Sequence, residues 1–392
     1  MQVIDLEISN LRPYEKNARR HPQKQIDVLA KNIERFGFTT PVLVSEDNEV
    51  IAGHGRLLAL KQLGRTEVPC VRMEGLTKEE IKALRFADNQ IASMGEWDMG
   101  LAIEELKGLS DEMFDLTGFD KDLIIGPDEQ DDIIPENAPP VAKLGDIWAL
   151  GRHRVMCGDS MKKEDVAMLM GDKKADMVFT DPPYGVDYQK KTENIVNQRK
   201  NILPVANDNL GKDALKLIVF PAFQNIANNL KNGGVYYICS PQGGELGLMM
   251  MMMMMDAGIE CRHMIVWKKD RAVFSMGRLD YDYQHEPILY GWRGSHKHIG
   301  NGQYKTSVWD IPRPSASKLH PTMKPVELMV NAILNSTKEE DLVIDYFLGS
   351  GSTLIACEKT NRICYGMELD PKYVDVIIER YEQYTGTKAQ KI

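Results

Sequence analysis

The hydrophobic positions of residues 1–95 alternate between the period of an amphipathic helix and the period of a strand. "IDVLAKNIERFG", from Ile26 to Gly37, carries apolar residues on one helical face, and its final glycine predicts the helix end. "PVLV" then predicts a short strand, and "EVIAGHGRLLALKQLG" predicts a strand, a turn and a helix in succession. These patterns indicate a small α/β domain over residues 1–95.

Residues 96–139 are set apart by their charge. They hold the helical patterns "MGLAIEELKGL" and "DEMFDLTGF", followed by "GPDEQDDIIPENAPP", whose proline, glycine and acidic content is typical of a linker. Fourteen acidic and two basic residues lie between Glu96 and Glu136. We expect an acidic helical segment and a solvated linker here, and a second domain over residues 140–392.

From Val141 onward, apolar runs of strand length alternate with helical patterns, as in "ADMVFTD", "GVYYICS", "DLVIDYF" and "ICYGMEL". This alternation predicts an α/β fold with a doubly wound, mostly parallel sheet. "HMIVW" and "PILYG" are separated by a polar stretch, so we expect them to form one antiparallel edge hairpin. Seven consecutive methionines, Met249 to Met255, predict a core helix because methionine favours helices and packs adaptably.

Length and composition are those of a two-domain globular protein, since 392 residues exceed what one core usually holds. The sequence has no N-terminal signal pattern and no apolar run of about 18 residues, which predicts a cytoplasmic protein without a membrane partner. Its six cysteines form no CxxC pair and no zinc-type cluster, so we expect no metal site. The net charge of −9 does not exclude a nucleic-acid partner, because residues 96–136 contribute −12 and the rest sums to +3.

A glycine-rich turn joins a strand to a helix in "VIDYFLGSGST", Val343 to Thr353. Glycines there permit tight turning and close ligand approach, and the N-terminus of the following helix favours negative charge. Glu368 ends the next predicted strand about 20 residues on, where a carboxylate can bind ribose hydroxyls. The turn lacks the GxGxxG and GxxxxGK[ST] patterns, so a nucleoside cofactor without phosphates is favoured over a dinucleotide or a triphosphate.

A second motif, "TDPPYG", follows the predicted strand "ADMVF". Its two prolines cannot extend the sheet, so they fix the backbone around Asp181 and Tyr184. With "FLGSG", the motif makes residues 141–384 resemble the DNA amino-methyltransferases, which transfer a methyl group from S-adenosylmethionine to an exocyclic base nitrogen. The motif precedes the glycine turn by about 160 residues, with "SVWDIPRP" and "HPTMKP" between them, as in the β subgroup of that family.

The resemblance implies a Rossmann-like methyltransferase sheet and assigns roles to single residues. In the catalytic motif, the Asp181 carboxylate and the Pro182 carbonyl each accept one hydrogen of the target amine. Pro183 adds rigidity, and Tyr184 stacks on the base after it leaves the DNA helix. Glu368 is expected at the ribose of the cofactor and Lys324 at its methionyl carboxylate, although Lys324 equally suits a solvated position. The residues implied in binding S-adenosylmethionine are Asp159, Lys324, Asp345, Phe347, Gly349, Gly351 and Glu368.

The target base is indicated by the first position of the motif. Within the resemblance, aspartate at Asp181 is usual for adenine N6, and serine is commoner for cytosine N4. Base recognition is expected within residues 261–325, where 11 basic and 5 acidic residues are interleaved with aromatic side chains. The strip "YQKKTENIVNQRKN" after the catalytic motif is a second candidate for DNA contacts. We therefore predict site-specific methylation of adenine N6 in double-stranded DNA.

Residues 1–95 resemble the ParB/sulfiredoxin-like fold through "TTPVLV", "VIAGHGRLLALKQLG" and "ADNQIA". Gly53, Arg56 and Ala59 match a GxxRxxA pattern, which implies contacts with nucleotide phosphates. The sulfiredoxin cysteine has no counterpart beside Arg56, and "ADNQIASMGEW" lacks the arginine of the ParB nucleotide-hydrolysing motif. We expect an accessory domain that binds DNA or a nucleotide.

Several alternatives stay open at the level of sequence. The methylated position is cytosine N4 in one, the substrate is RNA in another, and in a third the chain is a non-catalytic, ParB-like DNA-binding or regulatory protein. A carbon-5 cytosine enzyme with Cys70 as nucleophile is disfavoured, because Pro69-Cys70 lies far from the glycine turn. The recognised DNA site, a homodimer, nucleotide hydrolysis and a partner restriction nuclease are left undecided.

Overall fold

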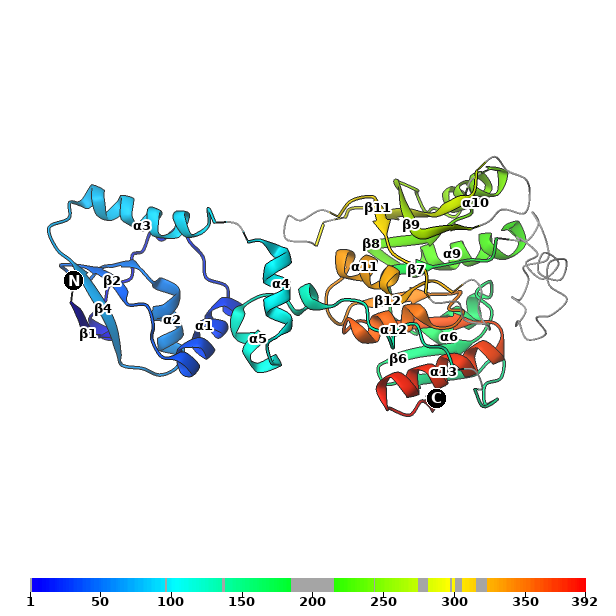
Figure 1. Cartoon of the computed structure of the whole chain (residues 1–392), viewed down its shortest axis with the longest axis horizontal. Coiled ribbons are helices and arrows are strands. Elements are labelled where there is room, and N and C mark those ends of the chain that lie inside the picture. The colour runs from blue at the N-terminus through cyan, green and yellow to red at the C-terminus, as the bar shows by residue number, and fades with distance from the viewer. Residues whose placement is uncertain are drawn as a thin grey trace. The chain divides into compact units, whose positions relative to one another are not determined.

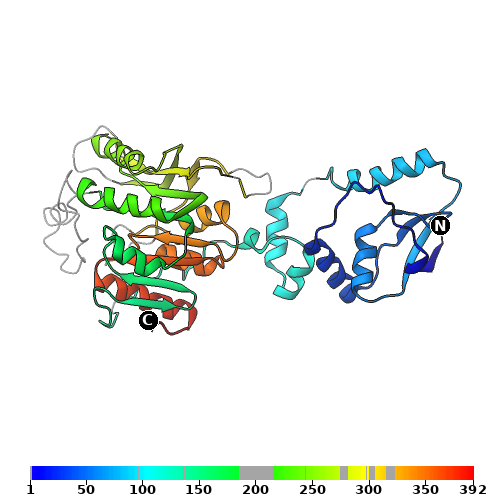
Figure 2. The same cartoon turned by 180° about the vertical axis from the view of Figure 1, so that it is seen from behind.

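The computed structural model describes residues 2–95, 97–135, 138–184, 215–242, 244–273, 281–296, 298–299, 305–314 and 323–392. Contacts divide the chain into two compact units, Met1–Ile124 and Ile125–Ile392, which Figures 1 and 2 show from opposite sides. This division falls inside residues 96–139. The two helices of that acidic segment therefore group with the first unit, and the stretch after Ile124 groups with the second.

The first unit is built on a four-stranded sheet in the order β1-β4-β2-β3. β1 and β3 are antiparallel to their neighbours, whereas β2 is parallel to β4. The predicted first helix is confirmed, and Gly37 ends it with a φ of 79° while its N–H donates to the carbonyl of Ile33. The elements are β1 (Val3–Glu7), α1 (Gln23–Phe36), β2 (Val42–Ser45), β3 (Val50–Ala52), α2 (His54–Gln62), β4 (Glu67–Met73), α3 (Lys78–Ala92), α4 (Met99–Lys107) and α5 (Asp111–Thr117), with short 3-10 turns at Ile8–Asn10 and Lys121–Ile124.

The second unit holds a ten-stranded sheet in the order β11-β9-β10-β8-β7-β12-β13-β6-β5-β14. Its strands are β5 (Ile147–Leu150), β6 (His153–Cys157), β7 (Ala175–Thr180), β8 (Leu230–Cys239), β9 (His263–Val273), β10 (Tyr283–Trp292), β11 (Val308–Asp310), β12 (Leu342–Asp345), β13 (Ile363–Glu368) and β14 (Gln390–Lys391). The five central strands, from β8 to β6, are parallel. This arrangement confirms the predicted α/β, mostly parallel core.

Antiparallel strands flank the parallel core on both sides. β9 and β10 form the predicted antiparallel hairpin, and β10 joins it to β8. The prediction that this hairpin is the edge of the sheet is wrong, because β11 pairs parallel to β9 outside it. At the other edge, β5 is antiparallel to β6 and to β14, which the sequence analysis did not anticipate. Only two residues, Gly151 and Arg152, separate β5 from β6, and a connection this short permits an antiparallel pair but no parallel crossover.

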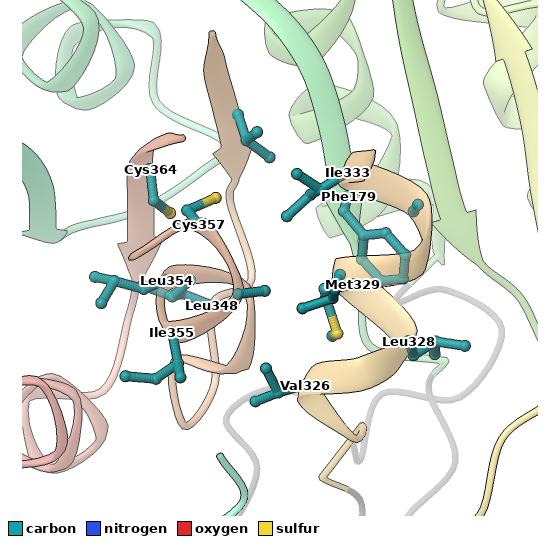
Figure 3. Close-up of a cluster of buried hydrophobic side chains, with 14 of the residues drawn as sticks. Phe179, Val326, Leu328, Met329, Ile333, Leu348, Leu354, Ile355, Cys357 and Cys364 are labelled. Atoms are coloured by element: carbon teal, nitrogen blue, oxygen red, sulfur yellow. The ribbon is translucent and has the colours of Figure 1, made fainter. Parts of the chain in front are cut away.

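Helices cover both faces of the sheet. They are α6 (Lys163–Met170), a π-helical turn at Leu215–Val219, α9 (Phe220–Asn229), α10 (Gly244–Asp256), α11 (Val326–Ser336), α12 (Ser352–Lys359) and α13 (Pro371–Thr385). α11, α12 and α13 pack on the face that carries Phe179. Figure 3 shows Phe179 beside Met329 and Ile333 of α11, with Leu354 of α12 in the same buried cluster. α6, α9 and α10 pack on the face that carries Val178. The predicted methionine helix is confirmed as α10, whose Met250 and Met254 are buried in that second layer.

The prediction of a solvated linker is wrong at Asp131 and Asp132. Asp131 is only 2% exposed, and its carboxylate lies 2.5 Å from the Nζ of Lys359. Asp132 accepts a hydrogen bond of 2.9 Å from the N–H of Val326, the first residue of α11. These carboxylates bind a cation and a helix N-terminus of the second unit, so this part of the segment packs within that unit. Among the described residues, no helix is long and apolar enough to cross a membrane.

Candidate active site

The two chemical motifs meet at the carboxyl ends of adjacent parallel strands. β7 ends in Thr180 and β12 ends in Asp345, and the two strands are paired in the sheet. The Oγ1 of Thr180 donates a hydrogen bond of 2.7 Å to the Oδ1 of Asp345, across 165 positions of sequence. The crevice at the carboxyl ends of such strands is where open α/β sheets bind ligands. The catalytic motif and the glycine turn therefore share one site.

Asp181 is held by two donors. Its Oδ1 accepts a hydrogen bond of 2.7 Å from the hydroxyl of Tyr184, and its Oδ2 lies 2.5 Å from the Nζ of Lys324. Burial and the nearby Asp181 carboxylate raise the pKa of Tyr184 well above its usual range, so this hydroxyl stays protonated. Pro182 is buried and Pro183 is half-buried. The predicted stacking of Tyr184 on a base stays a prediction; in this structure its hydroxyl orients Asp181.

Two charged residues that the sequence analysis did not single out extend this contact. The Nζ of Lys324 also lies 3.3 Å from the Oε2 of Glu286, and Lys269 donates to the Oε1 of Glu286. Lys324 is 8% exposed and Lys269 6%. Both residues missed by sequence lie on the antiparallel hairpin, Lys269 on β9 and Glu286 on β10. A charge within an otherwise apolar strand, as in "HEPILYGW", was the available signal.

The charges in this group support one another. Burial would lower the pKa of Lys324, but the carboxylates of Asp181 and Glu286 outweigh it and raise that pKa well above its usual range. Burial would likewise raise the pKa of Glu286, but Lys324 and Lys269 lower it. Both groups are therefore ionised at neutral pH. The sequence prediction for Lys324, a contact with the cofactor, stays a prediction; its described partners are the two carboxylates.

The glycine turn leaves space beside a buried carboxyl group. Gly349 has a φ of 54°, and a Cβ added there would meet no atom within 4 Å. Its N–H donates a hydrogen bond of 2.9 Å to the Oε2 of Glu368. Burial raises the pKa of Glu368 to about 7. Gly351 precedes α12 with a φ of 86°, and a Cβ there would lie 3.2 Å from Ile377.

Asp345 supports the turn through three hydrogen bonds. Besides the bond from Thr180, it accepts a hydrogen bond of 2.7 Å from the hydroxyl of Thr353 and one of 3.1 Å from the N–H of Phe347. Burial raises its pKa to about 6. These bonds connect the end of β12 to the first helical turn of α12. The predicted cofactor contacts of Asp345 and Phe347 stay predictions.

Asp159 lies at the same edge of the sheet, after β6. The N–H of the preceding residue, Gly158, donates a hydrogen bond of 3.0 Å to the carbonyl of Glu368, and β6 pairs with β13. The Oδ1 of Asp159 accepts a hydrogen bond of 3.0 Å from the N–H of Met161. The fold thus brings Asp159 to the strand end that carries Glu368.

The remaining predicted residues lie elsewhere. Gly53 has a φ of 98° at the start of α2 in the first unit, and Arg56 donates 2.6 Å to the carbonyl of Thr40. Their predicted phosphate contacts stay a prediction. The strip "YQKKTENIVNQRKN" lies outside the described residues, as do residues 274–280, 297, 300–304 and 315–322 of the predicted recognition region.

Comparisons with known proteins match both parts of the chain. The DNA methylase family matches residues 175–379, and the ParB N-terminal domain matches residues 1–89. The chain is 40% identical over 80 residues to the ParB-like nuclease domain-containing protein YnaK of Escherichia coli (strain K12), which covers 20% of this chain and 92% of YnaK. It is 30% identical over 138 residues to the type II methyltransferase M.Cfr9I of Citrobacter freundii, covering 32% of this chain and 46% of M.Cfr9I.

Among solved structures, the M1.HpyAVI–SAM complex aligns with a TM-score of 0.44 and 19% identity, covering 58% of this chain and 98% of that chain. The chain spans about half the length of the methyltransferase relative M.Cfr9I. The DNA methylase match covers more than half of the chain and includes both the catalytic motif and the glycine turn. The protein therefore belongs to the N6/N4 DNA methylase family and carries an N-terminal ParB domain.

Proposed function

We propose that this protein transfers a methyl group from S-adenosylmethionine to the exocyclic N6 of adenine in double-stranded DNA. One observation carries the proposal: Asp181 and the glycine turn end neighbouring strands and are joined by the bond from Thr180 to Asp345. A base-binding group and a nucleoside-binding turn at one crevice fit a reaction between a base and a nucleoside cofactor.

The residues of the turn fit S-adenosylmethionine. The open space at Gly349 allows close approach of a ligand, and the carboxyl group of Glu368 behind it suits ribose hydroxyls. Neither the space at Gly349 nor the carboxyl group of Glu368 requires a ligand that carries phosphate groups. When bound, the cofactor supplies an electrophilic methyl group on a sulfonium, which becomes a neutral thioether when the methyl group leaves.

The catalytic motif prepares the target amine for attack. An exocyclic amine conjugated to its ring is a poor nucleophile, so acceptors that hold its hydrogens favour a lone pair directed away from the ring. Asp181 accepts one hydrogen and the Pro182 carbonyl accepts the other. As the nitrogen–carbon bond forms, the amine becomes cationic and loses one proton, for which the Asp181 carboxylate is the nearest acceptor.

Adenine is preferred over cytosine because the first position of the motif is Asp181. The alternative, methylation of cytosine N4, uses the same geometry of acceptors, and the family match includes enzymes of both kinds. Residues 1–95 are proposed as an accessory module for DNA or a nucleotide, because Gly53 leaves room for the cationic guanidinium of Arg56, whose Nη2 would lie 3.3 Å from a Cβ at position 53.

The test is to incubate the full chain with radiolabelled S-adenosylmethionine and unmethylated genomic DNA, digest the DNA and identify the labelled nucleoside. We expect N6-methyladenine. Label in N4-methylcytosine contradicts the choice of base. Absence of label with cofactor binding intact supports a non-catalytic protein instead.

Asp181→Ala tests the role of the motif. Because Asp181 contacts the base and not the cofactor in this proposal, we expect transfer to fall by about a thousandfold or more while the Kd for S-adenosylmethionine changes by less than about threefold. Normal transfer by this variant contradicts the mechanism.

A further inference from the structure

Asp181, Lys324, Glu286 and Lys269 form a row of alternating charges, in which the two lysines are buried and the two carboxylates are partly buried. The Nζ of Lys324 lies 2.5 Å from the Oδ2 of Asp181 and 3.3 Å from the Oε2 of Glu286. Lys269 holds the other oxygen of Glu286 from the far side. Glu286 comes from β10, Lys324 precedes α11 and Asp181 follows β7, so three separate elements bring these groups together.

This arrangement creates a competition at Asp181. Both of its oxygens already have donors, the hydroxyl of Tyr184 on Oδ1 and the ammonium of Lys324 on Oδ2. A target amine has to share or displace one of them. The Lys324 contact joins two opposite charges, whereas Tyr184 is a neutral donor, so the ammonium is the stronger competitor. A buried ammonium leaves one carboxylate only if a second carboxylate receives it.

We propose that Glu286 is a positioning residue that receives the ammonium of Lys324 when the target amine binds Asp181, and that it thereby sets the affinity of the site for the target base. The proposal rests on the methyl transfer proposed above. The Oε2 of Glu286 is already within 3.3 Å of this ammonium, so a small movement of the lysine side chain completes the exchange.

Lys269 keeps Glu286 ready for this role. It is 6% exposed and its ammonium also lies 5.0 Å from the ring centroid of Trp267, which holds it at the hairpin. Because Lys269 bonds to Oε1, the Oε2 that faces Lys324 is left as the receiving atom. The row of two anions and two cations remains neutral throughout the exchange.

The first variant to measure is Glu286→Gln in the full chain. Glutamine keeps the side-chain volume and an oxygen for Lys269 but cannot take up an ammonium as a carboxylate does, so Lys324 stays on Asp181. With unmethylated genomic DNA, we expect the KM for DNA to rise about tenfold or more, the size of one charge-assisted hydrogen bond, while the KM for S-adenosylmethionine changes less than about twofold. Glu260→Gln, which makes the same change at an exposed carboxylate, is the matched control and should behave as wild type.

The decisive measurement adds Lys324→Met to this variant. If Lys324 is the competitor, the double variant should have a KM for DNA about fivefold or more below that of Glu286→Gln alone. In the background with Glu286 intact, by contrast, Lys324→Met alone should impair methyl transfer. A purely structural role of the row gives additive losses. A wild-type KM in Glu286→Gln, or a double variant no better than Glu286→Gln, overturns the proposal.

Two further outcomes keep the result decisive. If Glu286→Gln does not fold, Glu286→Asp is used, which retains the charge but withdraws it by one methylene. We expect Glu286→Asp to raise the KM for DNA and the added Lys324→Met to lower that KM again. If the effects of the two substitutions on the KM for DNA are additive losses, the proposal is overturned. If the wild-type chain labels no DNA, the proposed function itself fails, which is distinguishable because the role of Glu286 is read only from variants of an active enzyme.

Discussion

Three carboxyl groups at neighbouring strand ends differ in what holds them. Asp181 contacts a cation and a phenol, and Asp345 accepts bonds from two hydroxyl groups and an amide. Within the part of the chain that the structure describes, the hydrogen bonds to Glu368 come from backbone N–H groups. Burial outweighs these hydrogen bonds, which lower the pKa values, and raises the pKa of Asp345 to about 6 and that of Glu368 to about 7. These different environments suit the different roles proposed for the three residues: Asp181 at the base, Asp345 in the turn and Glu368 at the ribose.

Glu368 predicts a pH-dependent affinity for S-adenosylmethionine. Its pKa rises from 4.5 to about 7 on folding, so the ionised form, which accepts hydrogen bonds from ribose hydroxyls more strongly, becomes populated between pH 6 and 8. We expect the Kd to fall as pH rises over about that range, by at most about tenfold per pH unit. Calorimetric titration checks this.

The control is Glu368→Gln, whose Kd should be weak and independent of pH. A wild-type Kd that is flat across the range contradicts the assignment. The sign for stability is opposite: a carboxyl whose pKa is raised on folding binds more protons in the folded state, so the ligand-free protein loses stability as pH rises from 4.5 to about 7.

At the scale of elements, the turn between β12 and α12 combines two glycines with different tasks. Gly351 needs its left-handed conformation and also has Ile377 against it, whereas Gly349 faces open space. Gly351 is therefore required by the packing of the fold itself, whereas Gly349 leaves space for a ligand.

Alanine at each position separates these tasks. Gly351→Ala should lower the free energy of unfolding by about 1–2 kcal/mol through strain and contact with Ile377. Gly349→Ala carries only the strain of about 1 kcal/mol, but its methyl group occupies the ligand space, so its main effect should be a weaker Kd for S-adenosylmethionine. Denaturant unfolding and cofactor titration of both variants test this. A loss of affinity only in Gly351→Ala contradicts it.

The stretch around Asp131 is a second element with an internal task. The carboxylate of Asp131 pairs with Lys359 at the end of α12, and the backbone carbonyl of Asp131 accepts a hydrogen bond of 2.6 Å from Arg380 of α13. Asp131→Asn should lower the free energy of unfolding by about 3 kcal/mol, since it leaves a largely buried ammonium without its charged partner. Asp111→Asn, at an exposed carboxylate 3.4 Å from Lys121, is the control and should leave unfolding unchanged. Equal effects in denaturant titrations contradict this account.

At the scale of the whole molecule, the two compact units divide the tasks. All the residues proposed to act on base or cofactor lie in residues 125–392. The residues around Asp131 belong to this unit by their contacts, although their composition is that of a linker.

Two fragments test this division. Residues 125–392 should bind S-adenosylmethionine with the affinity of the full chain, because every described contact of the turn is retained. Residues 140–392 lack Asp131 and Asp132, so this fragment should unfold at a lower denaturant concentration. We expect its free energy of unfolding to be lower by about several kcal/mol. Equal stability of the two fragments contradicts the assignment of this stretch to the second unit.

The sequence by itself determined most helices, most strands, the parallel core, the catalytic motif and the glycine turn. These are local: periodicity reports which face of an element is apolar, and a motif reports chemistry at adjacent positions. Only the tertiary structure decided that Lys324 contacts Asp181 across 143 positions, that Glu286 stands behind it, and that Asp131 is buried. The reason is physical, since strand order selects which distant charges meet in the interior. A charged residue has the same local pattern whether its partner is water or a buried ion.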